Sequence, residues 1–438
     1  MTAAPLAAIV TTDLTAITRG RFLPADRIAD AAAAGIGWAP ANISLLPSGV
    51  IAADDFWGSS GDLRILPDLS ARAVTSLTGA PSPFDLTPGD IVNLDGSPWP
   101  ACARTALRQA LAAFSEATGL KLIASFEQEF QILDANLPDA HPFAFDALRR
   151  AEPFAGRYFA ALADAGVEPE TLISEYGPNQ FEITVAPTDA LAAADRAVTV
   201  REITREMARL QGWRATFAPK TEPDVVGNGV HIHFSLVDAT GAPVGFDPRG
   251  PGRLSPVAAS FAAGVLAHMR SFLAITAPNP TSYLRLRPHN WSSAWTWLGE
   301  RDREASLRIC PTVGFAGKDP ARQFNLEYRA ADATANPYLA LAVLVQAGLD
   351  GVRRKLPAPA VFSGDPATLT AAEREALGLY RLPETLAAAL DLLEDAEAVR
   401  SWFAPELVRS FLAVKRAEVA AANGLSESEL CQNCARYY

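Results

Sequence analysis

The stretch LIASFEQEF at residues 122–130 decides the architecture that this sequence predicts. Side chains of a strand alternate between its two faces, so Phe126 and Phe130 share one face while Glu127 and Glu129 share the other. We therefore expect a strand with one apolar face packed on a core and one face that carries two carboxylates.

Five further stretches combine an apolar face with ionisable groups in the same way. They are FEITV at 181–185, VHIHF at 230–234, LRLR at 284–287, SLRI at 306–309 and LEYR at 326–329. Taken singly, each is most simply a strand with a solvated outer face. Solvent faces usually mix Thr, Lys, Gln and Ser, however, whereas these six strands carry almost only residue types that bind metals or anions. We therefore predict a curved sheet with helices outside and a charged concave face.

A second acidic pair precedes residue 185. Glu175 lies seven residues before Glu182, a spacing that would place the two carboxylates on opposite faces of one continuous strand. Gly177 and Pro178 lie between them, and a turn at that point resets the alternation. We therefore expect both carboxylates to reach one pocket.

Five carboxylates would converge on the concave face: Glu127, Glu129, Glu175, Glu182 and Glu327. They would repel one another, and some would have to be protonated unless cations neutralise them. Carboxylate-rich sites with one histidine suit hard divalent ions such as Mg²⁺ or Mn²⁺. Five carboxylates are too many for one Mg²⁺ that also keeps water and phosphate ligands, so two or more ions are predicted. Phosphates and a carboxylate substrate would then face Arg285, Arg303, Arg308 and Arg329.

The length of 438 residues favours two domains. Residues 1–97 hold short strand-like runs broken by Gly and Pro, and Pro98 and Pro100 then interrupt the chain. Residues 98–438 alternate strands with longer helices, so the predicted class is α+β. The expected helices are about 104–118, 188–211, 256–275, 337–351 and 404–422.

Bulk properties exclude several functions. The net charge of −11 offers no basic surface for nucleic acid. The first 13 residues lack the cationic segment of a signal peptide, and no apolar run is long enough to span a bilayer, so a cytoplasmic protein is expected. The CxxC formed by Cys431 and Cys434 has no second pair nearby, so packing is favoured over a zinc site.

Six motifs, in one order over nearly the full chain, resemble the glutamine synthetase family. They are EQEF at 127–130; Glu175 and Glu182 followed by VAP at 185–187; GNGVHIH at 227–233; SYLRLRP at 282–288; the stretch 303–309; and EYR at 327–329 followed by ANPY at 335–338. The resemblance implies a small β-grasp-like domain over 1–97 and a large catalytic domain over 98–438, with a curved antiparallel sheet backed by helices. It also implies a homo-oligomeric ring, for which we expect a dodecamer.

The resemblance further implies a role for each matching residue. One metal would be held by Glu129, Glu175 and Glu182, and a second by Glu127, His231 and Glu327. Glutamate would be bound by Gly227, Arg285 and Arg329. ATP would be contacted by His233, Ser235 and Arg308, with Arg322 as a further candidate. Arg303 would stabilise charge on the phosphoryl group that passes from ATP to glutamate before an amine attacks.

The sequence departs from the family where the amine should bind. After Pro288 the family typically reads GYEAP, with a Glu that deprotonates ammonium, whereas HNWSS at 289–293 places Trp291 at that position. Near the start, FWGSS at 56–60 places Trp57 where the family has an ammonium-binding Asp. Loss of both acids argues for a substituted amine, and His289 is the nearest titratable side chain that could act as base.

The predicted function is therefore ATP-dependent ligation of the glutamate γ-carboxylate to a substituted amine. Trp57, Trp291, Trp295 and Trp297 could line an apolar acceptor pocket, although simple packing is an equal alternative for Trp295 and Trp297. A small apolar or aromatic amine is favoured over a polyamine, because no further acid is evident to hold a distal charge. Two alternatives stay open: an ordinary glutamine synthetase that uses ammonia, and a non-catalytic sensor of glutamate or ATP.

Overall fold

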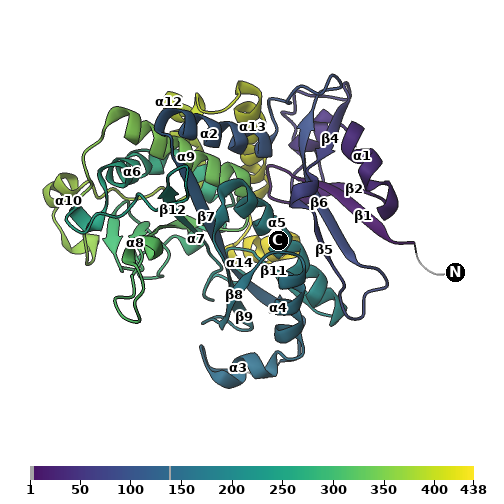
Figure 1. Cartoon of the computed structure of the whole chain (residues 1–438), viewed down its shortest axis with the longest axis horizontal. Helices are drawn as coiled ribbons and strands as arrows, with labels where there is room; N and C mark the ends of the chain where they lie inside the picture. Colours follow the sequence, from purple (N-terminus) through teal and green to yellow (C-terminus); the bar gives the residue numbers. More distant parts are fainter. Residues whose placement is uncertain (1–3, 138–139) are drawn as a thin grey trace.

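The computed structural model describes residues 4–137 and 140–438 (Figure 1). Within these residues the strands form two sheets, one of six and one of nine strands, and helices cover them, which confirms the predicted α+β class. The first sheet has the order β2-β1-β6-β4-β3, with β5 beside β6. Its strands are β1 (Leu6–Thr12), β2 (Thr18–Pro24), β3 (Ile36–Trp38), β4 (Leu63–Pro67), β5 (Ala73–Thr75) and β6 (Phe84–Val92).

The second sheet has the order β13-β14-β15-β12-β7-β9-β8, and β10 and β11 also pair with β7. Its strands are β7 (Lys121–Leu133), β8 (Pro169–Ser174), β9 (Gln180–Val185), β10 (Thr188–Asp189), β11 (Arg214–Thr216), β12 (Val230–Val237), β13 (Leu298–Glu300), β14 (Leu307–Ile309) and β15 (Leu326–Ala331). The pairings are antiparallel except for β13 with β14. β7, which contains the stretch 122–130, lies at the centre of this sheet.

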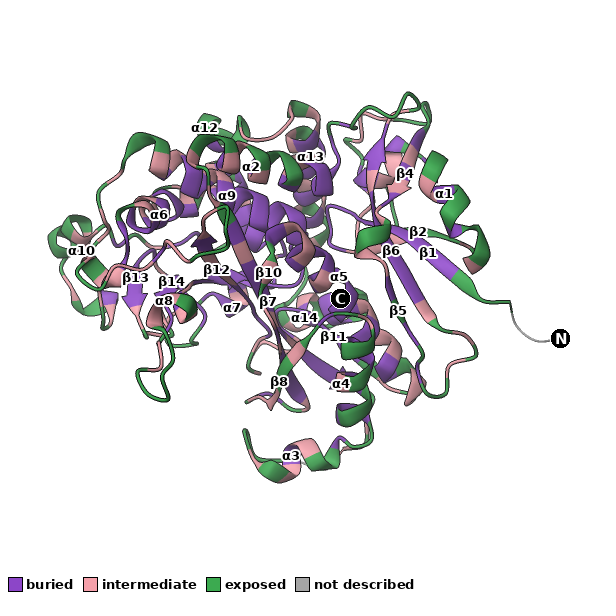
Figure 2. Cartoon of the chain, viewed as in Figure 1, coloured by how far each residue is buried: buried purple, intermediate pink, exposed green. Residues whose placement is uncertain are grey.

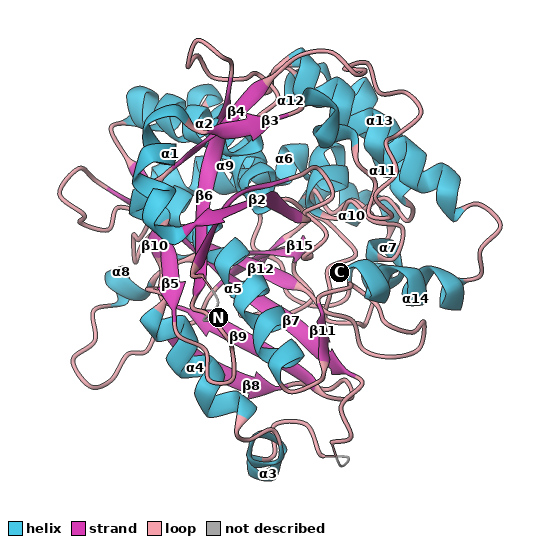
Figure 3. Cartoon of the chain, turned by 90° about the vertical axis from the view of Figure 1, so that its right-hand side faces the viewer, coloured by secondary structure: helices cyan, strands magenta, loops and turns pink. Residues whose placement is uncertain are grey.

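All five predicted helices are present, with ends shifted by a few residues. The α-helices are α1 (Ile28–Ala34), α2 (Ala103–Thr118), α3 (Phe145–Arg150), α4 (Phe154–Asp164), α5 (Ala190–Leu210), α6 (Pro256–Thr276), α7 (Ser282–Arg285), α8 (Pro320–Gln323), α9 (Pro337–Arg354), α10 (Ala371–Leu377), α11 (Leu386–Asp395), α12 (Glu397–Arg400), α13 (Pro405–Ala422) and α14 (Glu427–Tyr437). α5 packs along β7 and α4 against β8 (Figure 3).

The core lies between the apolar face of the second sheet and its helices (Figure 2). Phe126 and Phe130 are almost fully buried there, as their alternation predicted. α6 pairs closely with α9 because Gly264 and Gly351 bring the two backbones together; a Cβ on Gly264 would lie 2.1 Å from the carbonyl oxygen of Ala347. α6 is long and apolar enough to cross a membrane, but 67% of its most apolar window is buried inside the protein. It is therefore a core helix.

One predicted strand is wrong. The stretch LRLR at 284–287 is not extended, because α7 runs through Ser282–Arg285. The Asn279 side chain accepts from the Thr281 N–H at 3.0 Å, and its carbonyl accepts from the Ser282 N–H at 3.0 Å, so the chain turns into a helix. Alternation over four residues cannot distinguish a strand from one helical turn.

Candidate active site

Strand register places the predicted ligand residues opposite one another. Glu129 on β7 pairs with Glu182 on β9. Glu127, two residues earlier on β7, pairs with His231 on β12. On the other side of β12, Glu327 on β15 pairs with His233, two residues after His231. Directly opposed side chains in a sheet lie within contact distance, so four neighbouring strands bring these groups to one face.

Glu175 joins them through a tight hairpin turn. Its N–H donates to the Gln180 carbonyl at 2.8 Å, which closes the turn between β8 and β9. The Gly177 N–H donates to the Gln180 side chain at 2.7 Å. The alternation is reset here as predicted, and Glu175 and Glu182 line the same cavity.

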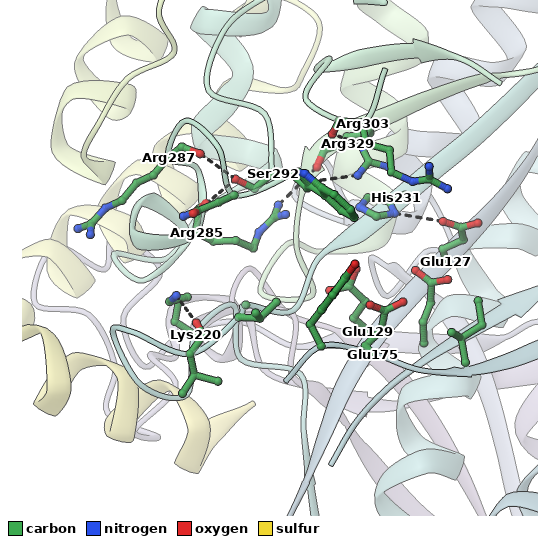
Figure 4. Close-up of a pocket in the computed structure, with 18 of the residues that line it drawn as sticks. Glu127, Glu129, Glu175, Lys220, His231, Arg285, Arg287, Ser292, Arg303 and Arg329 are labelled. Carbon is green, nitrogen blue, oxygen red and sulfur yellow. Dashed lines mark hydrogen bonds and ion pairs between the residues drawn. The ribbon is translucent and has the colours of Figure 1, made fainter. Parts of the chain in front are cut away.

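This cavity has a volume of about 1020 Å³ and is lined by residues of β7, β8, β9, β12 and β15 of the second sheet. Its carboxylate floor consists of Glu127, Glu129, Glu175, Glu182, His231 and Glu327. The predicted groups Gly227, Arg285, His289, Trp291, Arg303, Arg308 and Arg329 also line it. In Figure 4 the labelled carboxylates Glu127, Glu129 and Glu175 lie on one side of the pocket, and Arg303 and Arg329 lie across from them.

The donor groups of the floor suit divalent ions. Ligand atoms of Glu127, Glu182 and His231 lie within 4.8 Å of one another, and so do those of Glu127, His233 and Glu327. His231 Nδ1 lies 3.1 Å from Glu127 Oε2 and 3.5 Å from Glu327 Oε1, so the predicted second ligand set is brought together. His233, expected to contact ATP, has its Nε2 3.2 Å from Glu127 Oε1.

The predicted first ligand set is looser. Glu182 joins a compact ligand group, whereas Glu129 accepts a hydrogen bond from the Gly229 N–H at 2.7 Å. Gln180 Nε2 lies 3.4 Å from the same Glu129 oxygen. Glu129, Glu175 and Glu182 thus face one cavity from adjacent strands. One carboxylate oxygen of Glu129 is occupied by hydrogen bonds from Gly229 and Gln180.

Two carboxyl groups of the floor, Glu175 and Glu182, have raised pKa values because of burial and neighbouring negative charges. Burial and the neighbouring Glu127 and Glu129 raise the pKa of Glu182 well above its usual range. Burial, followed by the charge of Glu129, raises the pKa of Glu175 to about 7. Protons therefore stand in for missing positive charge on these two carboxyl groups, which is the behaviour expected of residues that need a cation.

Two other members of the floor are held ionised. Burial by itself raises the pKa of Glu127. The nearby His233 and His231 outweigh that effect and lower the pKa well below its usual range. Burial also raises the pKa of Glu327, but this effect is outweighed mainly by the charge of Arg329, and the pKa falls to about 2. Glu327 also accepts from Arg308 Nη1 at 2.7 Å. The arginines therefore hold the β15 carboxylate in its charged form.

Arg285 is positioned to receive an anion. Its Nη2 donates to the Ala331 carbonyl at 2.6 Å, while its buried Nε has no partner among the described residues. Burial lowers the pKa of this guanidinium. A buried guanidinium with a free N–H is costly unless an anion completes its hydrogen bonds, so Arg285 has the properties of a carboxylate-binding group.

The loop that carries Trp291 is held by two hydrogen bonds of the Trp291 backbone, one to Glu304 and one from Arg329. His289, Trp291 and Ser293 have φ values of 64°, 52° and 74°, which non-glycine residues seldom adopt. The Trp291 N–H donates to Glu304 Oε1 at 2.6 Å, and its carbonyl accepts from Arg329 Nη2 at 3.1 Å. These contacts fix the backbone and leave the indole 53% exposed at the cavity.

Sequence reasoning missed two aromatic residues beside Trp291. The rings of Tyr176 and Trp291 meet edge to face with centroids 5.7 Å apart, and Phe143 meets Tyr176 in the same way at 5.0 Å. All three line the cavity and form its aromatic rim. Tyr176 directly follows Glu175, which was a usable signal, whereas nothing near Phe143 in the sequence pointed to the site.

The other predicted tryptophans lie elsewhere. Trp57 packs on Trp99 with centroids 4.8 Å apart and donates to Ser410 Oγ at 3.0 Å. Trp297 is buried in a small apolar cluster, and Trp295 lies between two arginine side chains. Packing was therefore the correct interpretation for Trp295 and Trp297, and within this chain Trp57 is not part of the cavity lining.

Several predicted site residues have weaker contact with the cavity. The His289 side chain is 72% exposed, and its Nε2 lies 3.6 Å from Asp365. Arg322 is exposed beside Asp319, and Ser235 lines a separate small cavity near Phe324. Neither Arg322 nor Ser235 lines the main cavity.

The buried cysteines of α14 behave as packing residues. Cys431 and Cys434 are free thiols on one turn of helix, and burial raises the pKa of Cys431 to about 11. Cys434 Sγ accepts from Thr281 at 3.3 Å. Both thiols are thus kept protonated and enclosed.

Comparison with known proteins accounts for the whole chain. The description "Glutamine synthetase N-terminal domain" matches residues 2–99, and "Glutamine synthetase, catalytic domain" matches residues 100–432. A crystal structure described as a "novel glutamine synthase homolog" superposes with a TM-score of 0.92 at 44% identity, covering 100% of this chain and 99% of that one.

Two characterised relatives are named for substituted amines. The chain is similar to gamma-glutamylpolyamine synthetase GlnA3 of Streptomyces coelicolor, with 38% identity over 95% of this chain and 90% of that protein. It is also similar to glutamate–isopropylamine ligase of a Pseudomonas species, with 29% identity over 83% of this chain and 79% of that protein.

Proposed function

The chain belongs to the glutamine synthetase family, and on that premise we propose that it joins the γ-carboxylate of glutamate to a substituted amine at the expense of ATP. One observation carries this proposal: all six residues expected to hold metal line one cavity, and Trp291 lines it too, at the position where the sequence resemblance expects an ammonium-handling acid. This supports activation of glutamate at the floor and an acceptor other than ammonia. The names of the relatives that act on polyamine and isopropylamine support the same direction.

We propose that the floor binds two divalent ions, Mg²⁺ or Mn²⁺. Glu129, Glu175 and Glu182 would hold one, and Glu127, His231 and Glu327 the other. The donor set fits hard cations because it is almost wholly carboxylate, and the raised pKa values of Glu175 and Glu182 indicate unmet positive charge. When bound, such ions would offset the charge that accumulates when a phosphoryl group approaches a carboxylate.

The arginines would orient the two anionic substrates. Arg285, with its unpartnered Nε, would pair with the glutamate α-carboxylate, and Arg329 and the backbone of Gly227 would complete that site. His233, Ser235, Arg308 and Arg322 are proposed for ATP, with Arg308 the one among them that lines the cavity.

The reaction would proceed in two transfers. The glutamate γ-carboxylate oxygen attacks the γ-phosphorus of ATP, the bond to ADP breaks, and γ-glutamyl phosphate forms. The neutral amine then attacks the acyl carbon, phosphate leaves, and one proton is lost from nitrogen. Arg303 would stabilise the transferring group, and His289 is proposed to take the proton. Trp291 cannot serve as that base, since an indole offers an N–H donor and an apolar face.

Three broader features belong to the same proposal. A ring-shaped homo-oligomer, with twelve subunits expected, would bring the N-terminal part of one chain to the cavity of its neighbour. A domain boundary between residues 97 and 98 and a cytoplasmic location are proposed as well. Light scattering of the purified protein tests the assembly, and a fully active monomer would contradict it.

The proposed activity is tested by incubating the protein with ATP, Mg²⁺, glutamate and single amines, while phosphate release and product mass are followed. We expect phosphate release to depend on amine and a γ-glutamyl amide to appear. Glutamine from ammonia as the best product would establish the ordinary synthetase instead. ATP and glutamate binding without any amide would establish the sensor.

A further inference from the structure

We propose that the aromatic rim of Phe143, Tyr176 and Trp291 binds the substituent of the acceptor amine, and that this substituent is apolar, with an aryl or butyl-sized alkyl group favoured over a second ammonium. The inference rests on the proposed function and adds the surface that would bind the apolar amine expected from the sequence. Neither Phe143 nor Tyr176 stood out in the sequence.

The rim has the geometry of a binding surface. Its rings meet edge to face at interplanar angles of 86° and 87°, so together they form a continuous wall. Each of the three residues is about half exposed, with 54% for Phe143, 49% for Tyr176 and 53% for Trp291. Rings that only packed would be buried, as Trp297 is. Three half-exposed rings that line one cavity are a surface that gains from contact with an apolar group.

The rim also lies at the correct end of the cavity for an acceptor. Tyr176 directly follows Glu175 of the carboxylate floor. The Trp291 carbonyl is bonded to Arg329, which itself contacts Glu327 of the floor. The rim is therefore next to the floor, so an amine whose substituent lies on the rim can have its nitrogen beside the groups proposed to hold glutamate and phosphate.

Charge near the rim decides between an apolar and a cationic substituent. Aromatic faces attract cations, so a diamine is the competing ligand. Outside the floor, however, the described lining residues include Lys220 and Arg303, which form no ion pair with a carboxylate among the described residues, and one acid, Asp224. A second ammonium would be repelled by these two cations, whereas an alkyl or aryl group carries no charge to be repelled.

Neighbouring side chains extend the apolar surface. Pro223, Val225 and Val226 line the cavity from the segment that Lys220 ties down through a hydrogen bond to the Val225 carbonyl. Ile173, at the end of β8, adds a further aliphatic group. Burial of a methylene is worth about a fourfold gain in binding, so a butyl group has room to improve kcat/KM well beyond that of methylamine.

The test compares kcat/KM for amide formation with methylamine, butylamine, benzylamine and 1,4-diaminobutane, in wild type and variants. We expect wild type to prefer butylamine to 1,4-diaminobutane and benzylamine to methylamine, each by about tenfold or more. Phe143→Ala should lower the benzylamine-to-methylamine ratio about tenfold, and Trp291→Ala should lower it at least as far.

Phe145→Ala is the matched control. Phe145 lies two residues from Phe143, is 84% exposed and does not line the cavity, so its loss should leave the ratio unchanged. A preference for the diamine, or a ratio that Phe143→Ala and Trp291→Ala do not move, would overturn the inference while the proposed function stands. Failure of the proposed function is different: glutamine from ammonia would then exceed every amide.

Discussion

The carboxylate floor and the aromatic rim border the same cavity but are built in opposite ways. The floor stands mainly on paired strands, where the register of β7, β9, β12 and β15 fixes which side chains face one another. The rim stands on loops, half exposed, with Trp291 at a φ of 52°. Under the proposed function, the difference implies that activation of glutamate depends on the sheet, whereas the choice of amine depends on loops that can change without disturbing the sheet.

The largest expected effect comes from removing a floor carboxylate. We predict that Glu129→Ala or Glu327→Ala lowers ATP turnover by about 10³-fold or more. Each variant would lose a ligand of a proposed divalent ion, and the charge of the approaching anions would then no longer be offset. Steady-state phosphate release measures this, and circular dichroism verifies folding. Glu300→Ala is the control, since Glu300, on β13 of the same sheet, pairs with Arg253 and does not line the cavity. Equal losses in all three variants would remove the distinction between the floor and its surroundings.

The second largest effect is expected at Arg285, the residue proposed to bind the glutamate α-carboxylate. We predict that Arg285→Lys raises the KM for glutamate by about 10- to 100-fold, since a point charge cannot replace a guanidinium that binds a carboxylate through two hydrogen bonds. Initial rates over a range of glutamate concentrations give the value. Arg287→Lys should change little, because Arg287 pairs with Glu427 at 2.8 Å and points away from the acids in Figure 4. An unchanged KM for Arg285→Lys would place glutamate elsewhere.

A change of rim chemistry should alter specificity more than rate. We predict that Trp291→Glu raises the yield of glutamine relative to γ-glutamyl amide by about tenfold, because a carboxylate can hold and deprotonate ammonium where an indole cannot. Product ratios from mixtures of ammonia and butylamine measure this. If the ratio stays at its wild-type value, the rim does not set the choice of amine.

The smallest effect concerns pH. In the metal-free protein Glu175 has a pKa of about 7 and that of Glu182 is also raised, so Mg²⁺ must displace protons from them. We predict that Mg²⁺ affinity rises several-fold per pH unit between pH 5 and 7. Isothermal titration calorimetry at several pH values tests this, and affinity independent of pH would contradict it.

The same shifts predict the stability of the metal-free protein. Between the unfolded pKa near 4.5 and the folded value, the folded state binds more protons than the unfolded state. Metal-free stability should therefore fall as pH rises through that range, and Mg²⁺ should restore it most at the upper end.

The sequence predicted the floor well for a physical reason. Alternation along a strand is strict, so Glu127 and Glu129 had to share a face, and the reset at Gly177 explained Glu175. The error at residues 284–287 arose where four residues fit a strand or a helical turn equally. Phe143 was beyond reach, because it meets Tyr176 through a loop whose path depends on the Phe143 N–H bond to the Ser174 carbonyl.

The central claim is that this member of the glutamine synthetase family ligates a substituted amine in preference to ammonia. The most direct measurement is one reaction that contains ATP, Mg²⁺, glutamate and equal concentrations of ammonia and butylamine, with products quantified by mass spectrometry. We predict that γ-glutamylbutylamide exceeds glutamine by at least about tenfold. Glutamine as the major product would contradict the account.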